Sequence, residues 1–329
     1  MNPYIGHEFQ LFGVEEYTLN GGKREGMKIL HIKNGLGLEM CISLNRGGDI
    51  SSLSLHGKNM SYLCPNGYVH SAYYDDKGIG WLKSFTGGFL TTCGFNNVGN
   101  PCQDEDGEYP LHGSVNNIPV DSYSYDVVEN EYIDVKMIVL DEGIFSRKLK
   151  RIRHIKVSLN ENTFDIDDEI INRGDNVTPV LVLYHMNMGY PLLKEDSIVY
   201  INSSSVKARN EHAQSDIENC LKMMKPTPQY EEMCYYHKMK TGKAGIYSPS
   251  ENIGLMINYD CDSLKEFTEW KMMGVRDYVL GLEPGNVNPD GYVINKQKNL
   301  LTYVKPNEKL HYALTIELFD DVNEFNKRR

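Results

Sequence analysis

The sequence predicts an all-β protein in which antiparallel strands form a large sandwich or barrel. Short segments of alternating apolar and polar residues follow one another along the 329-residue chain, with Gly, Asn and Asp between them. Helical periodicity is weak almost everywhere. No linker, internal repeat or shift of composition marks a boundary. Because sandwiches and barrels often keep more than about 200 residues in one piece, we expect a single domain over residues 1–329.

The expected strands recur through the first two thirds of the chain. They cover residues 27–34, 36–45, 48–60, 121–129, 132–140, 145–159, 163–173 and 179–193. Within this series, residues 147–154 carry basic side chains on both faces, so we expect a solvated edge strand there rather than a binding face. Two segments are candidates for helices: residues 207–224, which the prolines of "KPTP" follow, and a shorter segment at 263–273.

Composition narrows the class of partner. The formal charge of -11 comes from 34 basic and 45 acidic residues, which argues against nucleic acids and anionic membranes. The seven cysteines are odd in number and show no C-x-x-C spacing, so we expect reduced thiols in a cytoplasmic protein. The first residues lack the pattern of a signal peptide, and no apolar stretch approaches the ~18 residues of a membrane helix.

The segment from Trp81 to Pro119 differs from the rest. It is rich in Gly, Asn and Pro and has little periodicity. Such a long irregular segment is either functional or an irregular edge of the sandwich, and the sequence favours neither. It contains His112, which lies between Pro110-Leu111 and a glycine, so its position is restricted.

The segment "PVLVLYHMNMGYPLL", residues 179–193, begins as a buried strand and then turns polar. Because side chains alternate along a strand, one face carries Leu181, Leu183, His185 and Asn187. This order suits a strand that leaves a core and enters a cleft. The alternative is a buried histidine that is hydrogen-bonded to a neighbour.

Glu283 ends a second apolar strand, in "YVLGLEPGN". It shares a face with Val279 and Gly281, and the glycine leaves room for a small ligand. Partial desolvation raises the pKa of a carboxylate and suits it to general-base catalysis near neutral pH. The alternative is an edge carboxylate that caps the following turn.

Other chemistries have less support. A metal held by His112, His185 and Glu283 is conceivable, but no H-x-H pair or H-E-x-x-H helix fixes two ligands locally, and we expect no metal. The motifs of nucleotide-binding loops and of serine hydrolases are absent from the sequence.

Four stretches together give the sequence a family resemblance. They are "NRGGDISSLSLHGKNMSYLCP", "GGFLTTCGFNNVGNPCQDEDGEYPLHGS", "LYHMNMGYPLL" and "WKMMGVRDYVLGLEPGN". They extend from about Arg46 to Asn286 and resemble the aldose 1-epimerase (galactose mutarotase-like) superfamily, in particular a less characterised bacterial branch. The resemblance implies an all-β fold, a large antiparallel β-supersandwich with few short helices.

The resemblance also implies roles for individual residues. His185 would donate a proton to the ring oxygen of a sugar, Glu283 would act as the general base on the C1 hydroxyl, and His112 would hold the sugar. Ring opening needs one proton removed and one delivered, so no cofactor is required. The sequence departs from the family where "TTCGFNNVGNP" lacks the usual arginine, which Arg46 or Arg276 could replace.

We therefore expect a carbohydrate-active isomerase, an aldose 1-epimerase (mutarotase) that interconverts the anomers of a monosaccharide or derivative. Its partner would be a small-molecule sugar, and the protein a monomer or homodimer. The alternatives are a non-catalytic carbohydrate-binding protein and a metal-dependent sugar isomerase or lyase. The candidate sugar-contacting residues are His112, Asn117, Asn187, Trp270 and Arg276, of which Trp270 offers an aromatic face.

Overall fold

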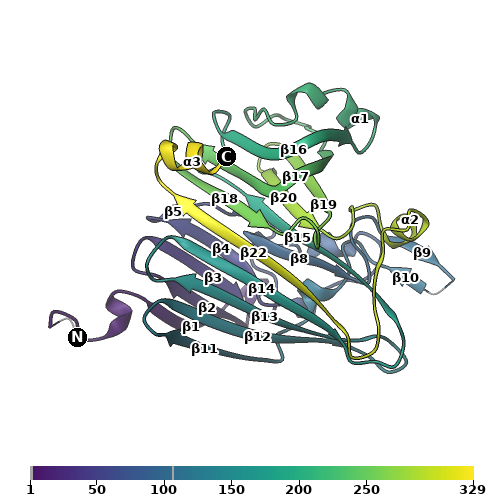
Figure 1. The fold of residues 1–329 in the computed structure, drawn as a ribbon, viewed down its shortest axis with the longest axis horizontal. Coiled ribbons are helices and arrows are strands. Elements are labelled where there is room, and N and C mark those ends of the chain that lie inside the picture. Colours follow the sequence, from purple (N-terminus) through teal and green to yellow (C-terminus); the bar gives the residue numbers. More distant parts are fainter. Residues whose placement is uncertain (1–2, 106) are drawn as a thin grey trace.

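Two antiparallel sheets dominate the computed structural model, which describes residues 3–105 and 107–329 (Figure 1). The smaller sheet comes from the N-terminal part of the chain. Its strands, in spatial order, are β1 (Gly13–Leu19), β2 (Met27–Lys33), β3 (Leu38–Ser43), β4 (Asp49–Leu55) and β5 (Lys58–Asn59). β2, β3 and β4 match the expected strands closely, because each alternates apolar residues toward the core with polar residues outward, whereas β1 is a strand that the sequence did not predict.

The larger sheet contains most of the remaining strands. In spatial order they are β11 (Ser122–Val128), β12 (Tyr132–Glu142), β13 (Lys148–Ser158), β14 (Thr163–Asn172), β22 (Lys309–Phe319), β18 (Ile253–Tyr259), β17 (Met233–Ser248), β19 (Glu266–Met273), β20 (Tyr278–Gly285), β15 (Thr178–Met188) and β21 (Thr302–Val304). In addition, β16 (Ile198–Ala208) pairs with β17, and β8 (Leu90–Phe95) pairs with β15.

Only short elements complete the fold. They are the strand pairs β6 (Tyr62–Leu63) with β7 (Gly87–Gly88) and β9 (Cys102–Asp104) with β10 (Gly107–Tyr109), and the helices α1 (Glu211–Gln214), α2 (Tyr292–Gln297) and α3 (Val322–Arg328). The all-β fold class is therefore confirmed. Within residues 3–105 and 107–329, no helix has both the length and the apolar character needed to cross a bilayer.

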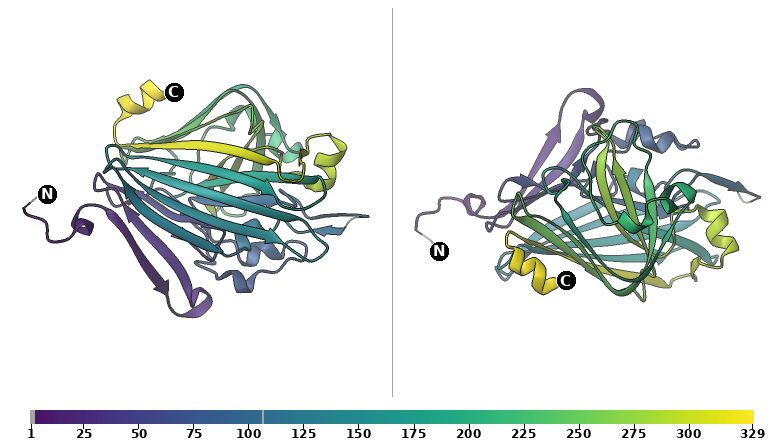
Figure 2. Two further views of the ribbon diagram at one scale, coloured as in Figure 1. Left: turned by 60° about the horizontal axis from the view of Figure 1, so that its bottom comes forward. Right: turned by 90° about the horizontal axis from the view of Figure 1, so that it is seen from above.

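The two sheets stack face to face around a common core. Figure 2 shows the N-terminal sheet against one side of the long strands of the larger sheet. One contiguous cluster of buried apolar side chains joins them, with members from Leu30 in β2 to Leu318 in β22. Burial of apolar area on this scale is the main stabilising contribution to a sandwich.

Both helix predictions are wrong in their main part. Residues 207–224 contain the end of β16, the four-residue helix α1 and a short 3-10 turn, rather than one helix. Residues 263–273 form β19 at their C-terminal end. In residues 263–273, pairing of β19 with β17 and β20 satisfies the backbone hydrogen bonds that a helix would otherwise make, so tertiary contacts override local helix propensity. In residues 207–224, only Lys207 and Ala208 pair with β17.

The prediction of a solvated edge strand at residues 147–154 is also wrong. β13 lies between β12 and β14, and Arg151 and Arg153 are buried. The Arg153 guanidinium donates to both carboxylate oxygens of Asp168, at 2.8 and 2.6 Å, and to Asp49 of the other sheet at 2.8 Å. The paired carboxylates compensate the charge that burial would otherwise make costly.

The irregular segment of residues 81–119 resolves into two kinds of structure. β8 is buried along its whole length and pairs with β15, so the expectation of irregularity fails there. The remainder consists of short strands, 3-10 turns and the loop around His112, which folds back against β8: the Gly94 N–H donates to the His112 carbonyl oxygen at 2.9 Å. This contact brings the His112 loop beside β8, the strand that pairs with the His185 strand β15.

Candidate active site

A cavity of about 260 Å³ is lined by residues of the strands β15, β20 and β19 together with neighbouring loops. Its lining includes His112, His185 and Glu283, the three residues to which the sequence assigned chemistry. A concave site with a few converging polar groups is the usual setting for small-molecule binding. The structure therefore brings the predicted acid, base and loop histidine to one place.

The register of β15 against β20 places the two central residues side by side. Leu183 faces Gly285 and Met186 faces Leu282, and this register puts His185 opposite Glu283. Along β15, Leu181 and Leu183 belong to the apolar cluster under the cavity, whereas Val182 and Tyr184 belong to the core between the sheets. The predicted alternation of faces is thus confirmed.

His185 Nε2 and Glu283 Oε1 are 3.3 Å apart, and both residues are buried. Gly281 provides the space for the carboxylate, because a Cβ added at that position would lie 2.2 Å from Glu283 Oε1. Neither Glu283 Oε1 nor His185 Nδ1 has a hydrogen-bond partner in the described part of the chain. Buried polar atoms without a hydrogen-bond partner, on residues that line a cavity, are candidates for hydrogen bonds with a ligand.

Burial shifts the pKa values of this pair in opposite directions. Desolvation lowers the pKa of His185 to about 4, with a smaller opposing effect from the Asn187 side chain. Desolvation raises the pKa of Glu283 well above 4.5; the negative charge of Glu232 adds to this effect and Arg209 opposes it. Both shifts favour the uncharged forms of these side chains, the neutral imidazole and the protonated carboxyl group.

His112 is held in a fixed orientation by its loop. Its backbone φ of 56° is in the left-handed region, and its Nδ1 accepts a hydrogen bond from the Gly99 N–H at 3.3 Å. Its ring centroid lies 4.8 Å from that of Trp81, in a tilted contact, and 5.5 Å from that of His185, in an edge-on contact. Burial, with the nearby His185, lowers the pKa of His112 well below 6.5. A neutral ring whose Nδ1 accepts carries its proton on Nε2 and is a hydrogen-bond donor.

Trp270 is the second predicted contact residue that lines the cavity. Its ring centroid lies 5.2 Å from that of His185, and its Nε1 donates to Glu232 at 2.7 Å. Asn187 lies beneath the cavity rather than in its lining; its amide donates to the His185 carbonyl oxygen at 3.0 Å, and its Oδ1 has no partner among the described residues.

The other predicted contacts lie elsewhere. Asn117 is buried away from the cavity, where its Oδ1 accepts from Arg46 at 2.6 Å and from Ser84 at 3.3 Å. Arg276 is exposed in the turn between β19 and β20, with a φ of 72°. Neither Arg46 nor Arg276 lines the cavity.

Arg209 lines the cavity instead, and sequence reasoning missed it. It donates to the Asn100 side chain at 2.8 Å and to the Pro289 carbonyl oxygen at 3.3 Å. The prediction of a helix over 207–224 placed Arg209 in a helix instead of at the end of a strand. The signal that could have located it is Asn210, which caps α1 by accepting from the Ala213 N–H at 2.9 Å and thereby leaves Arg209 at the end of a strand. Glu232 and Cys234, also in the lining, carried no comparable signal.

Metal binding was considered for the same residues. Among the residues that the structure describes, no group of three or more His, Cys, Asp or Glu side chains is arranged to hold a metal ion.

Comparison with known proteins places the chain in a family. A family model described as a domain of unknown function (DUF4432) matches residues 24–318. The chain belongs to the DUF4432 family. No curated protein matches the sequence of this DUF4432 chain.

Solved structures share the fold of this DUF4432 chain over nearly its full length. A protein from Klebsiella pneumoniae described as a "putative aldose 1-epimerase" has a TM-score of 0.89 and 25% identity, over 96% of this chain and 85% of that one. A galactose mutarotase-like protein from Clostridium acetobutylicum has a TM-score of 0.67 and 13% identity, over 94% and 99%. A galactose 1-epimerase from Lactobacillus acidophilus has a TM-score of 0.64 and 12% identity, over 94% and 99%. The fold is therefore galactose mutarotase-like, as the resemblance implied.

Proposed function

We propose that this protein is an isomerase of the aldose 1-epimerase type, which interconverts the anomers of a monosaccharide or a simple derivative by acid–base ring opening. One observation carries the proposal: His185 Nε2 and Glu283 Oε1 lie 3.3 Å apart in a buried cavity, and both groups can exchange protons with a ligand. The similarity to structures described as aldose 1-epimerases and mutarotases supports the same class.

The reaction needs one mobile proton in the pair. Glu283 accepts the proton of the C1 hydroxyl while His185 delivers one to the ring oxygen, and the C1–O5 bond breaks to give the open-chain aldehyde. Rotation about C1–C2 and the reverse proton transfers close the ring to the other anomer. A sugar that enters the cavity supplies hydroxyl donors to the carboxylate, which favours ionised Glu283 and moves the proton to His185 before ring opening.

The other residues of the lining would hold the sugar. His112 would donate a hydrogen bond from its Nε2–H to a sugar oxygen, and Trp270 would pack the face of its aromatic ring against the sugar. Arg209 supplies guanidinium donors at the edge of the cavity. Fixing the sugar in this way holds O1 and O5 within reach of the two proton-transfer groups.

The test follows the optical rotation, or the NMR spectrum, of freshly dissolved α-anomers from a panel of sugars. We expect the wild-type protein to accelerate equilibration of at least one of them, and Glu283→Gln and His185→Asn each to lower kcat by about 10²–10⁴-fold, the usual contribution of a general acid or base. His154→Asn is the matched control. His154 lies on β13, pairs with Asp134 of β12 and does not line the cavity.

Three other results would redirect the proposal. Binding of a sugar without faster equilibration would indicate a carbohydrate-binding protein. Loss of activity on dialysis against a chelator, restored by a divalent metal, would indicate a metal-dependent isomerase or lyase. Full activity of Glu283→Gln would show that the base is another group.

A further inference from the structure

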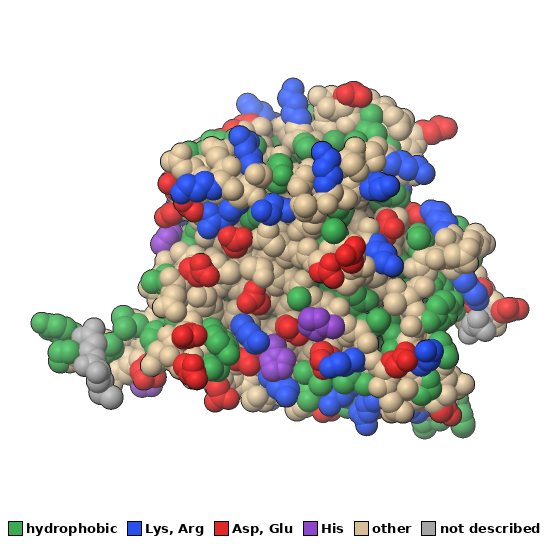
Figure 3. All heavy atoms as spheres, in the orientation of Figure 1, with side chains coloured by type: hydrophobic (Ala, Val, Ile, Leu, Met, Phe, Trp, Pro, Cys, Tyr) green, Lys and Arg blue, Asp and Glu red, His purple; other side chains and the backbone are tan. Residues whose placement is uncertain are grey.

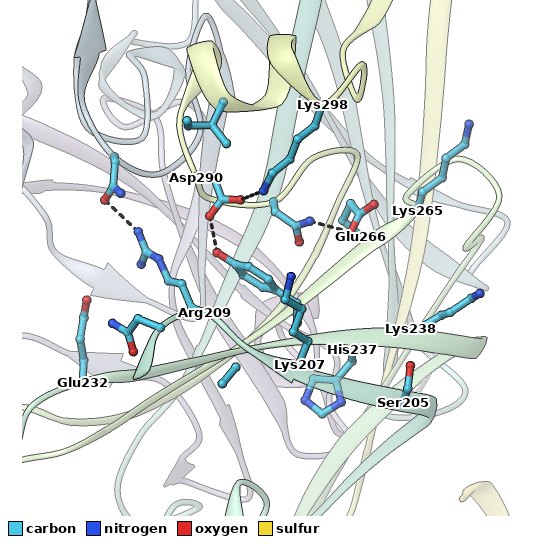
Figure 4. A pocket seen from close by; sticks show the side chains of 16 residues that line it. Ser205, Lys207, Arg209, Glu232, His237, Lys238, Lys265, Glu266, Asp290 and Lys298 are labelled. Atoms are coloured by element: carbon cyan, nitrogen blue, oxygen red, sulfur yellow. Dashed lines mark hydrogen bonds and ion pairs between the residues drawn. The ribbon is translucent and has the colours of Figure 1, made fainter. Parts of the chain in front are cut away.

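A larger groove, of about 930 Å³, adjoins the candidate active site. Asn100, Arg209 and Glu232 line both, so the groove and the cavity are continuous. Figure 4 shows Arg209 and Glu232 at one end of this groove, Lys207 in its middle, and Lys238 and Lys265 at the other end. A substrate seated over His185 and Glu283 can therefore extend past Arg209 without leaving the protein surface.

The groove is basic although the chain is acidic. Its lining contains five basic and three acidic side chains, whereas the whole sequence has 34 basic and 45 acidic residues. Over the face of the molecule in Figure 3, lysine and arginine side chains likewise gather on the upper part, around β16, β17 and α3. Clefts lined by one sign of charge attract ligands of the other sign.

The three acidic side chains of the groove neutralise little of its positive charge. Each of them already accepts hydrogen bonds from neighbouring side chains. Asp290 accepts from Lys298 at 2.7 Å and from Tyr236 at 2.6 Å, and Glu232 accepts from Trp270. The third acidic residue, Glu266, accepts from Asn288 at 2.8 Å.

By contrast, four cations of the groove have no carboxylate at ion-pair distance. In the part of the chain that the structure describes, this holds for Lys207, Arg209, Lys238 and Lys265. The Arg209 guanidinium donates to the Asn100 side chain, the Pro289 carbonyl oxygen and the Cys234 sulfur, none of which is a carboxylate. Four unpaired cations around one groove repel each other and so do not stabilise the fold. Their presence there is better explained by the binding of an anion.

Strand register aligns one of these cations, Lys207, with the acid–base pair. Lys207 faces Tyr236, Tyr236 faces Thr268, and Thr268 faces Glu283, so one transverse row crosses β16, β17, β19 and β20. Residues that face each other in neighbouring strands lie on the same side of the sheet. With strands ~4.8 Å apart, the backbone of Lys207 is about 14 Å from that of Glu283 along this row. A sugar with one charged substituent and an extended lysine side chain can together span that distance.

We propose that the substrate of the candidate active site is an anionic sugar, whose charged group lies in the basic groove and is held by Arg209 together with Lys207, Lys238 and Lys265. The inference rests on the function proposed above and names its substrate class. The charged group is a phosphate, a sulfate or a carboxylate, all of which accept hydrogen bonds from guanidinium and ammonium groups. It is attached to a carbon other than C1, because O1 must be a free hydroxyl for Glu283 to deprotonate.

The experiment compares D-glucose and D-galactose with their 6-phosphates, 6-sulfates and uronic acids in the same anomerisation assay. We expect kcat/KM for at least one anionic class to exceed that of its neutral parent by about tenfold or more, and to fall as salt rises, since screening weakens attraction between charges. The anionic class with the highest kcat/KM identifies which of phosphate, sulfate and carboxylate the groove binds best.

Lysine variants locate the effect. Single substitutions Lys207→Gln, Lys238→Gln and Lys265→Gln are each expected to lower kcat/KM for the anionic sugar by about two- to fivefold, the range of exposed charge pairs, and the triple variant by more than about tenfold. The rates for neutral sugars should not change. Lys240→Gln, on β17 but outside the groove, is the matched control.

A binding measurement keeps the two proposals separable. Both tryptophans of the chain, Trp81 and Trp270, line the cavity, so their fluorescence reports ligand binding. If no sugar equilibrates faster with the protein, the proposed function fails. If neutral sugars equilibrate as fast as anionic ones and the triple variant behaves like wild type in rate and in fluorescence titration, the function stands and the anionic substrate is overturned.

Discussion

Glu283 and His185 lose most of their hydration in the folded protein, and each responds by favouring its uncharged form. The carboxyl group keeps its proton to a higher pH, and the imidazole releases its proton at a lower pH than in water. Because the two groups are 3.3 Å apart, they titrate as a pair that holds one proton over a broad pH range. That singly protonated pair is the form that can both give and accept a proton.

The pH dependence of kcat/KM should therefore be bell-shaped and broad. As the pH falls through the pKa of His185, lowered by burial to about 4, the pair gains a second proton and cannot accept one from O1. As the pH rises through the pKa of Glu283, raised well above 4.5, the pair loses its proton and cannot protonate the ring oxygen. Polarimetry across this range, corrected for the buffer reaction, measures both limbs; an alkaline limb at the ordinary pKa of a glutamate would contradict the role of burial.

The catalytic roles of His185 and Glu283 came from the family resemblance and remain a proposal, whereas their place on a strand face came from strand alternation, which is a strict geometric rule. It fixed which neighbours of His185 and Glu283 share their face, and the structure agrees. It was insufficient for Arg209, whose place depends on where β16 ends, and for Asn117, whose loop turns toward Arg46 instead of the cavity. Loop direction and strand ends depend on distant contacts that a local pattern does not contain.

At the scale of elements, β13 links the two sheets through a buried charge. Arg153 pairs with Asp168 on the neighbouring strand and with Asp49 on β4 of the other sheet, and Tyr184 of β15 donates to Asp168 at 2.8 Å. Alternation predicted a strand here, but it could not show that one of the two polar faces is buried, because both faces carry basic residues. Only the partners on β4 and β14 make the burial possible.

Removing that charge should be costly. We expect Arg153→Ala to lower the free energy of unfolding by about 3–5 kcal/mol, because it leaves two carboxylates buried without a cation. Lys309→Ala is the control: Lys309 pairs with Glu169 at a side-chain exposure of 58% and 31%, and surface pairs contribute about 1 kcal/mol or less. Urea unfolding followed by circular dichroism measures both; equal losses would show that Arg153 is not a structural charge.

At the scale of the whole molecule, the fold class followed from the sequence and the arrangement of the sheets did not. Pairing of β8 with β15, and of β16 with β17, joins segments that lie far apart or have little strand-like pattern. The apolar cluster nevertheless runs without interruption from β2 to β22 and includes strands of both sheets. This continuity motivates the proposal that residues 1–329 form one domain.

A single domain of this kind should unfold in one step. Tryptophan fluorescence reports the cavity, since Trp81 and Trp270 both line it, whereas far-ultraviolet circular dichroism reports all strands. We expect the two signals to give the same midpoint in thermal or urea unfolding. Two separate midpoints would show that the sheet around the cavity and the N-terminal sheet are independent units.

The transverse row from His185 to Lys207 has a consequence for how such a protein can diversify. The proton-transfer pair sits on two central strands, where a slip of one residue would turn both side chains to the opposite face. Lys207, Lys238 and Lys265 lie on exposed stretches of other strands and their connections, where substitution leaves that register intact. Under the proposed function, substitutions at these lysines can therefore change which sugars bind without altering the positions of the two proton-transfer groups.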